Sequence, residues 1–252
     1  DTGALDFLGR GLESDYNAWW FCSFPSDAVR AIGLPLPLFI HGDDIEYGRR
    51  LQSNGFPNFC PGGISLWHES FDGKRLTWIR YFDCRNALIR LSTNTKKEII
   101  AEAQRRFDRF IIKNDYGACA MVIEAYRAFC QGPDVLRDKN FSTQIARLNQ
   151  MHSEYTYPLT AHDYVKIRAD VPGPRPRKWL RTIKRWTTNL AYCRGRSHSL
   201  WKTANTRYAW WNVPFYADIL VTTKESDYFY PRDYKAARKL SKTIKEVTNQ
   251  HS

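Results

Sequence analysis

The chain has 252 residues, 43% of them hydrophobic, and a formal net charge of +12. This length is enough for one sizeable core or two modest ones. No run of about 18 apolar residues is present, so we expect no membrane-spanning helix, and the N-terminus has no signal-peptide pattern. The composition therefore predicts a soluble, cytoplasmic protein.

Six cysteines are scattered along the chain without CxxC or zinc-finger spacing, which predicts free, buried thiols rather than a disulfide framework or a structural zinc site. The first residue is Asp1 rather than Met, which suggests that a longer chain has been cut or processed. The positive charge is concentrated late in the chain, because residues 166–207 hold 12 Lys and Arg against the single acid Asp170.

Residues 1–37 are predicted to form loops and one short helix. Residues 1–18 predict a loop that leads to the paired tryptophans Trp19 and Trp20. Residues 25–32 predict a short amphipathic helix that Gly33 ends, and the prolines of residues 34–37 then favour an extended segment.

Residues 41–56, HGDDIEYGRRLQSNGF, carry the most informative pattern. The adjacent carboxylates Asp43 and Asp44 stand just before a helical pattern, where free backbone NH groups and the helix dipole favour negative charge. The helix is predicted to bury Ile45, Gly48 and Leu51 and to end at residues 54–55 in the left-handed manner. An aspartate in this place is most often a helix cap, so the doublet alone does not identify a catalyst.

The remaining pattern predicts mostly helices. A strand over residues 63–67 ends at His68, a helix follows over 77–92, and 95–130 form one or two helices that break near 114–115. Further on we expect helices over 132–150 and 234–250, one or two strands in 208–223, and a basic amphipathic helix over about 176–193. That basic helix fits either an anionic membrane surface or docking on the domain with a solvated basic face.

Four motifs in order, YNAWW, PLPLFIHGDDIEYGRRL, PGGISLWHESF and YFDCRNALI, resemble the acceptor half of inverting family 2 glycosyltransferases. Within that family they look most like the actinobacterial galactan-building galactofuranosyltransferases. The close resemblance covers residues 14–92. Two positions depart from it: some of those enzymes carry histidine at Asp83 and an aromatic residue at Gly42, which affects acceptor and linkage specificity.

The resemblance implies a fold and a set of roles. The fold class is α/β: the C-terminal, acceptor-side part of a GT-A glycosyltransferase domain over residues 1–94, then a mainly α-helical domain with a small β element over 95–252. Asp44 would be the base that removes the acceptor hydroxyl proton, and His68 would bind the metal that holds the nucleotide diphosphate. The substrate-binding residues would be Trp19, Trp20, Asp43 and Trp67.

The implied reaction transfers galactofuranose from UDP-galactofuranose to a lipid-linked cell-envelope polysaccharide. It would need a divalent metal, Mn or Mg, whose other ligands belong to a nucleotide-binding half with a DxD motif that this chain lacks in a suitable place. We therefore expect an incomplete transferase that needs an N-terminal half, in cis or in trans. The expected location is cytoplasmic, on the inner face of the plasma membrane if the basic helix binds lipid.

Two other function classes remain open from the residues. A membrane-associated or polysaccharide-binding module would use the exposed aromatic residues without catalysis. Nucleic-acid binding would use the basic C-terminal region, but no recognition motif supports it and the N-terminal part is slightly acidic, so we expect no nucleic-acid partner.

Overall fold

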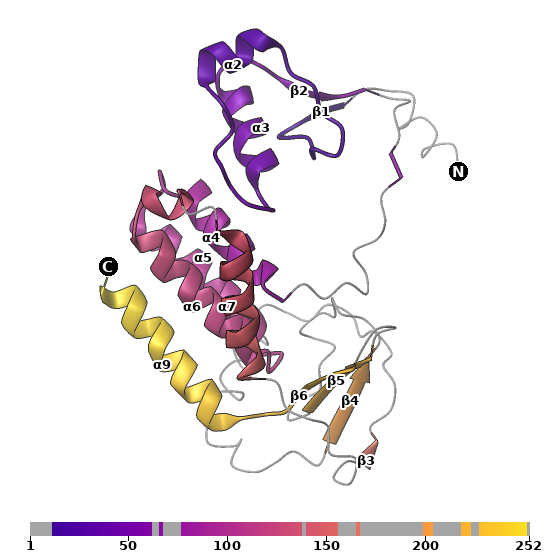
Figure 1. Ribbon diagram of the computed structural model, residues 1–252, viewed down its shortest axis with the longest axis vertical. Coiled ribbons are helices and arrows are strands. Elements are labelled where there is room, and N and C mark those ends of the chain that lie inside the picture. Colours follow the sequence, from indigo (N-terminus) through magenta and orange to yellow (C-terminus); the bar gives the residue numbers. More distant parts are fainter. Residues whose placement is uncertain are drawn as a thin grey trace. The chain divides into compact units, whose positions relative to one another are not determined.

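The structure is a computed structural model that describes residues 12–61, 66–67, 77–137, 140–155, 165–166, 199–203, 218–222 and 227–250. Contacts along the chain divide it into two compact units, unit 1 over residues 1–69 and unit 2 over residues 70–252. Figure 1 shows the elements of each. Within the described ranges the chain is mainly helical with two small sheets, which agrees at a coarse level with the expected mixture of helix and strand.

Unit 1 is built on a short antiparallel sheet and two helices. Its elements are β1 (Leu12–Ser14), α2 (Ser26–Ile32), α3 (Asp43–Ser53) and β2 (Asn58–Cys60), and β1 pairs with β2. The core consists of Ala28, Tyr47 and Leu51, against which Trp19, Ile32 and Phe56 pack. The short helix and its end at Gly33, with φ 76°, are confirmed.

The buried face of α3 differs from the prediction. Tyr47, Gly48 and Leu51 are its buried residues, whereas Ile45 is only half-buried. The predicted buried face rests mainly on the aliphatic residues Ile45 and Leu51. In the structure the phenol ring of Tyr47 fills the core instead of Ile45. Gly55, with φ 85°, confirms the predicted left-handed end of the helix.

Unit 2 contains a helical bundle arranged around one apolar helix, α6. The helices are α4 (Ile79–Arg90), α5 (Lys96–Ile111), α6 (Tyr116–Cys130), the 3-10 helix η1 (Pro133–Leu136), α7 (Phe141–Ser153) and α9 (Tyr234–Gln250). Helix α6 contacts α4, α5, α7 and α9. Because nearly every side of α6 is covered, most of its residues are buried and apolar.

Side chains fix where the helices of unit 2 begin. Thr95 and Glu98 form a reciprocal capping box at the start of α5. Asp115 accepts a hydrogen bond from the Ala118 backbone NH at 3.1 Å and thereby caps α6, and Asn140 caps α7 in the same way. The break predicted near residues 114–115 is confirmed, because α5 ends at Ile111 and α6 begins at Tyr116.

A four-stranded mixed sheet completes the described part of unit 2. Its strands, in spatial order, are β3 (Val165–Lys166), β4 (Ser199–Thr203), β5 (Asp218–Thr222) and β6 (Asp227–Tyr230). The first two pairings are parallel and the last is antiparallel. Where β6 leads into α9, the Asp233 backbone NH donates a hydrogen bond to the Tyr116 hydroxyl at 2.8 Å, so the sheet is connected to the start of α6.

Several sequence predictions are only partly tested. The terminal helix is confirmed as α9, whereas the helix expected over 132–150 is divided into η1 and α7. Residues 66 and 67 have no regular structure, and the rest of the strand predicted over 63–67, like the basic helix over 176–193, lies outside the described residues. The domain boundary predicted at residue 94 concerns the catalytic fold, which these contacts do not define, so it stays a prediction. Within the described ranges no helix is both long and apolar enough to cross a bilayer.

Candidate functional site

The carboxylate doublet occupies the first turn of α3, at the end of an unusual backbone segment. Asp43 and Asp44 are the first two residues of the helix, and the residue before them, Gly42, has φ 89°. Ile40 has φ 73°, a left-handed conformation that costs a β-branched residue on the order of 1–3 kcal/mol. The surrounding contacts must offset this strain for the doublet to be held in place.

The two carboxylates are accessible from solvent. Both side chains are half-buried. One oxygen of Asp44, Oδ1, accepts a hydrogen bond from the Ile45 backbone NH at 2.8 Å. No described cation forms an ion pair with either aspartate. Glu46, on the same helix, does pair with Arg50. Among the described residues no cation occupies the other carboxylate oxygen of Asp44. That oxygen can therefore accept a proton, or a hydrogen bond from a hydroxyl group.

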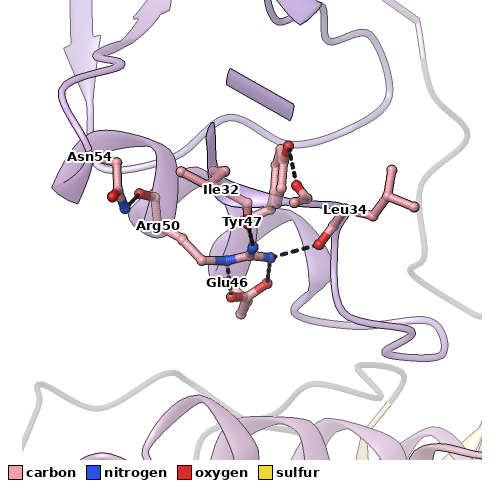
Figure 2. Close-up of polar contacts among 7 residues, drawn as sticks. Ile32, Leu34, Glu46, Tyr47, Arg50 and Asn54 are labelled. Atoms are coloured by element: carbon pink, nitrogen blue, oxygen red, sulfur yellow. Dashed lines mark hydrogen bonds and ion pairs between the residues drawn. The ribbon is translucent and has the colours of Figure 1, made fainter. Parts of the chain in front are cut away.

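A single arginine holds the segment before the doublet against α3. Arg50 donates through Nη1 to the Ile32 carbonyl at 2.5 Å and through Nη2 to the Leu34 carbonyl at 3.0 Å. The same guanidinium group forms a two-pronged ion pair with Glu46, at 2.8 and 3.0 Å. Figure 2 shows these contacts around one side chain. We call this set the Arg50 clamp: Arg50, Glu46 and the carbonyls of Ile32 and Leu34.

Tyr47 reinforces the clamp from inside the core. Its hydroxyl donates to the Gly33 carbonyl at 3.0 Å, as Figure 2 also shows, and the Arg50 guanidinium lies 4.9 Å from its ring centroid. The ring also packs on Trp19 and Phe24, at centroid distances of 5.8 and 5.2 Å. Tyr47 therefore links Trp19 to the helix that presents the doublet.

The predicted substrate-binding aromatics have different surroundings. Trp19 is half-buried in the Tyr47 cluster, so it has a packing role. The side chain of Trp20 is 62% exposed and that of Trp67 is 94% exposed, so both present aromatic surface to solvent. Trp19 packs on the core through Tyr47, which lies three residues after Asp44 on the same helix. His68 lies outside the described residues, and the predicted roles of all these residues stay predictions.

The other face of α3 rests on the chain that follows β1. Asn58 is buried and donates through Nδ2 to the Gly48 carbonyl at 2.8 Å and to the Asp15 carbonyl at 3.1 Å. Sequence reasoning missed Asn58, Tyr47 and Arg50 as contributors to the site. The spacing of Glu46 and Arg50, four residues apart on a helix, was the one signal that pointed to an ion pair.

Helix α4 carries the YFDCRN motif. It shares a charged network with α5, and it also bears a buried cation, Arg85. Asp83 accepts from Arg106 Nη1 at 2.5 Å, and Arg106 Nε donates to Glu102 at 2.7 Å. Arg85 is 2% exposed, and two of its nitrogens, Nε and Nη2, donate to Asn86 Oδ1. Burial lowers the pKa of Arg85, against the opposing effect of its hydrogen bond with Tyr81. Asp83 is therefore engaged in an ion pair with α5.

The expected metal requires ligands that the described part of the chain does not assemble. Among those residues no group of three His, Cys, Asp or Glu side chains gathers closely enough to hold an ion. Asp43 and Asp44 supply two carboxylates only. A metal would therefore depend on His68 or on ligands from another segment.

Comparison with known proteins relates the chain to glycosyltransferases. It is 30% identical over 153 residues to the galactofuranosyltransferase GlfT2 of Mycobacterium tuberculosis H37Rv, a match that covers 58% of this chain and 23% of that protein. It is 31% identical over 134 residues to GlfT2 of Mycolicibacterium smegmatis, covering 51% of this chain and 21% of that protein. The chain therefore spans less than a quarter of the length of these relatives. No protein-family profile matches it.

Proposed function

We propose that this chain is the acceptor-side part of an inverting GT-A glycosyltransferase of family 2. It would transfer galactofuranose from UDP-galactofuranose to a growing lipid-linked cell-envelope polysaccharide. The observation that carries the proposal is the doublet at the start of α3, which follows the segment held by the Arg50 clamp and is linked through Tyr47 to Trp19. The similarity to two galactofuranosyltransferases supports the choice of sugar.

In this proposal Asp44 acts as general base. Inversion at the anomeric carbon requires a base that removes the proton of the acceptor hydroxyl while its oxygen attacks. One oxygen of Asp44 is already oriented by the Ile45 amide, which leaves the other for the hydroxyl proton. Asp43 would orient sugar hydroxyls, and the exposed ring of Trp20 would pack on the apolar face of a sugar.

The proposal includes a partner for unit 1. All the large hydrophobic side chains that are exposed in the described residues belong to unit 1: Tyr16, Trp20, Phe21, Phe24, Leu34, Leu36, Ile40, Phe59, Leu66 and Trp67. Contiguous exposed apolar surface marks an interaction site, and these residues are the candidates for one. A nucleotide-binding half, supplied in cis or in trans, would cover part of it and bring the donor, the metal and the remaining ligands beside His68.

The decisive experiment is Asp44→Asn in the complete enzyme, in which this chain is joined to its nucleotide-binding half. Removing a general base should lower the rate of sugar transfer by about 10²–10⁴-fold while the unfolding temperature stays unchanged. The matched control is Asp27→Asn, which alters an exposed aspartate of α2 that pairs with Arg30. Turnover of Asp44→Asn at the wild-type rate would exclude Asp44 as the base.

The exposed tryptophans favour a second candidate, a polysaccharide-binding module without catalysis. Trp20 and Trp67 offer exposed aromatic surface of the kind that binds sugars. This candidate predicts saturable galactan binding by the chain alone, weakened in Trp20→Ala, with no effect of added nucleotide sugar. Strict dependence of glycan extension on UDP-galactofuranose in the complete enzyme would decide for the transferase.

Membrane association of the complete protein is part of the first proposal. A lipid-linked acceptor would keep the enzyme at the inner face of the plasma membrane, and the predicted basic helix over 176–193 would supply cations for the anionic lipid surface. Flotation of the protein with vesicles that contain anionic lipid, and its loss with neutral vesicles, tests this part.

A further inference from the structure

A cavity of about 440 Å³ lies at one end of the helical bundle of unit 2. Three helix ends border it, because Lys96 is the first residue of α5, Cys130 is the last of α6 and Gln250 is the last of α9. The residues that line it are Lys96, Ile99, Tyr126, Phe129, Cys130 and Gln250. Binding sites for small ligands commonly have volumes of about 300–1,000 Å³. The cavity therefore has the size of a ligand site.

The lining changes from buried and apolar to exposed and polar. Ile99 and Tyr126 are buried, Phe129 and Cys130 are half-buried, and Lys96 and Gln250 are exposed. The Tyr126 hydroxyl and the Cys130 thiol, one helical turn apart, form a hydrogen bond with each other. The inner lining therefore offers mainly carbon atoms to a ligand. A molecule that suits it has an apolar part and one polar end.

Lys96 is the cation of this lining, and its ammonium group forms no ion pair within the described part of the chain. The acid two residues later, Glu98, accepts hydrogen bonds from the Thr95 backbone NH and hydroxyl, at 3.0 and 2.8 Å. The dipole of α5 disfavours a positive charge in its first turn. The last carbonyl groups of α6 already accept hydrogen bonds from the backbone that follows. Neither helix electrostatics nor capping therefore accounts for Lys96.

The shape of the cavity favours a flexible chain over a flat ring. The rings of Tyr126 and Phe129 have centroids 6.4 Å apart and are inclined at 47° to each other, so a planar ligand cannot stack on both. An apolar cavity of ~150 Å³ holds one benzene molecule, so the volume here accommodates a chain of about ten carbon atoms.

The charge of the lining favours a carboxylate as the polar end. A phosphate group carries close to two negative charges at pH 7, and proteins commonly hold it with guanidinium groups or with several cations. The described lining contains a single ammonium group, that of Lys96, and no guanidinium group. A carboxylate carries one negative charge and therefore matches this lining.

We propose that the cavity binds a medium-chain fatty carboxylate. The chain would lie against Ile99, Tyr126 and Phe129, and the carboxylate would accept hydrogen bonds from Lys96 and from the Gln250 amide. All the lining residues belong to unit 2, and binding of the ligand requires no sugar transfer. Success or failure of this proposal is therefore independent of the Asp44→Asn test.

Thiol labelling of the full chain with N-ethylmaleimide tests the site, because Cys130 lines the cavity whereas Cys22 and Cys60 of unit 1 are exposed. Burial raises the pKa of Cys130, against the opposing effect of its hydrogen bond with Tyr126, so the labelling is done at mildly alkaline pH. Saturating decanoate should slow the labelling of Cys130 by about fivefold or more and leave Cys22 and Cys60 within about twofold, as measured by peptide mapping.

Neutral and phosphorylated ligands with the same chain test the choice of head group. Decanol, which has no charge, should protect Cys130 only at concentrations about tenfold higher than decanoate. Protection at a lower concentration of decyl phosphate than of decanoate overturns the assignment to a carboxylate. Absence of protection by decanoate, equal slowing of all three thiols, or equal protection by decanol overturns the proposal.

Lys96 and Lys97 provide a matched pair of variants. They are neighbours in the first turn of α5 and both are exposed, but only Lys96 lines the cavity. Lys96→Gln should raise the decanoate concentration for half-protection of Cys130 by about tenfold, whereas Lys96→Arg and Lys97→Gln should stay within about twofold of wild type. Equal effects of the two glutamine variants would show that Lys96 does not meet the carboxylate, and the proposal would fail.

Discussion

Gly48 of α3 lies directly against Tyr16, so closely that a Cβ atom added to Gly48 would be 2.6 Å from the Tyr16 Cβ. The Tyr16 backbone cannot move away easily, because Asn58 donates to the carbonyls of both Gly48 and Asp15, the residue before Tyr16. This contact sets the distance between α3 and the sheet of unit 1.

Gly48→Ala should therefore destabilise unit 1 by about 1–3 kcal/mol, although alanine is the better helix former. The measurement is amide hydrogen exchange of peptides from residues 43–60, which reports unit 1 alone. Gln52→Ala, at an exposed position of the same helix, is the control and should leave exchange unchanged. Faster exchange in both variants would show that the close approach is not the cause.

The Arg50 clamp should affect the doublet through the loop that precedes it. Arg50→Lys keeps the charge but loses the fork that reaches the Ile32 and Leu34 carbonyls, so residues 33–42 should exchange amide hydrogens at least tenfold faster. In the complete enzyme kcat should fall while the KM for the nucleotide sugar stays near its wild-type value. Arg49→Lys, at an exposed position, is the control, and equal effects of the two variants would remove the positioning role of Arg50.

Glu102 should make unit 2 sensitive to acid. Burial alone would raise the pKa of Glu102, but hydrogen bonds and charges from Arg105 and Arg106 outweigh it and hold the pKa below its ordinary value. The folded state thus binds fewer protons than the unfolded chain below about pH 4.5, and the stabilisation, complete above that pH, is lost as the pH falls through the folded pKa.

The test of this pH dependence compares urea unfolding of wild type and Glu102→Gln at pH 7 and at pH 3. The difference in stability between the two proteins should be on the order of 1 kcal/mol at pH 7 and should shrink at pH 3. Glu98→Gln is not a suitable control because Glu98 belongs to the capping box, so Glu246→Gln on α9 is used instead. A constant difference at both pH values would contradict the depressed pKa.

Cysteine reactivity should separate exposed from buried thiols. All five cysteines that the structure describes are free, but Cys22 and Cys60 are exposed, so the prediction that every thiol is buried was wrong for these two. Burial raises the pKa of Cys84 to about 12 and that of Cys119 well above its ordinary value. Peptide mapping after brief iodoacetamide treatment should find label on Cys22 and Cys60 and none on Cys84 or Cys119 until urea is added.

Single helices and their ends could be predicted from the sequence, because the residues that specify each one lie close together in the chain. The stripe of Ile99, Ala103, Phe107, Phe110 and Ile111 recurs at helical spacing, and all five are buried in α5. Gly33 and Gly55 marked the ends of α2 and α3 correctly, because their conformations, with φ 76° and 85°, suit glycine.

The contacts that position the site were not predictable in the same way, because they join residues far apart in the chain. Arg50 lies outside the predicted buried stripe of Ile45, Gly48 and Leu51, yet its fork reaches carbonyls 16 and 18 residues earlier. Nothing in the alternation of polar and apolar residues shows which backbone carbonyl a guanidinium group will meet. The roles of Asp44, Asp43, Trp20 and Trp67 came from resemblance to a family, and they await the experiments above.

The central place of α6 has a consequence for how the protein is made. Helix α9 is synthesised about a hundred residues after α6, yet it covers part of that helix and its preceding turn is tied to Tyr116. A nascent chain that has not reached residue 234 therefore exposes to solvent the apolar surface of α6 that α9 covers. Rare codons or a premature stop between α6 and residue 234 should therefore increase the binding of chaperones to the nascent or truncated chain. Ribosome profiling combined with chaperone capture would detect this binding.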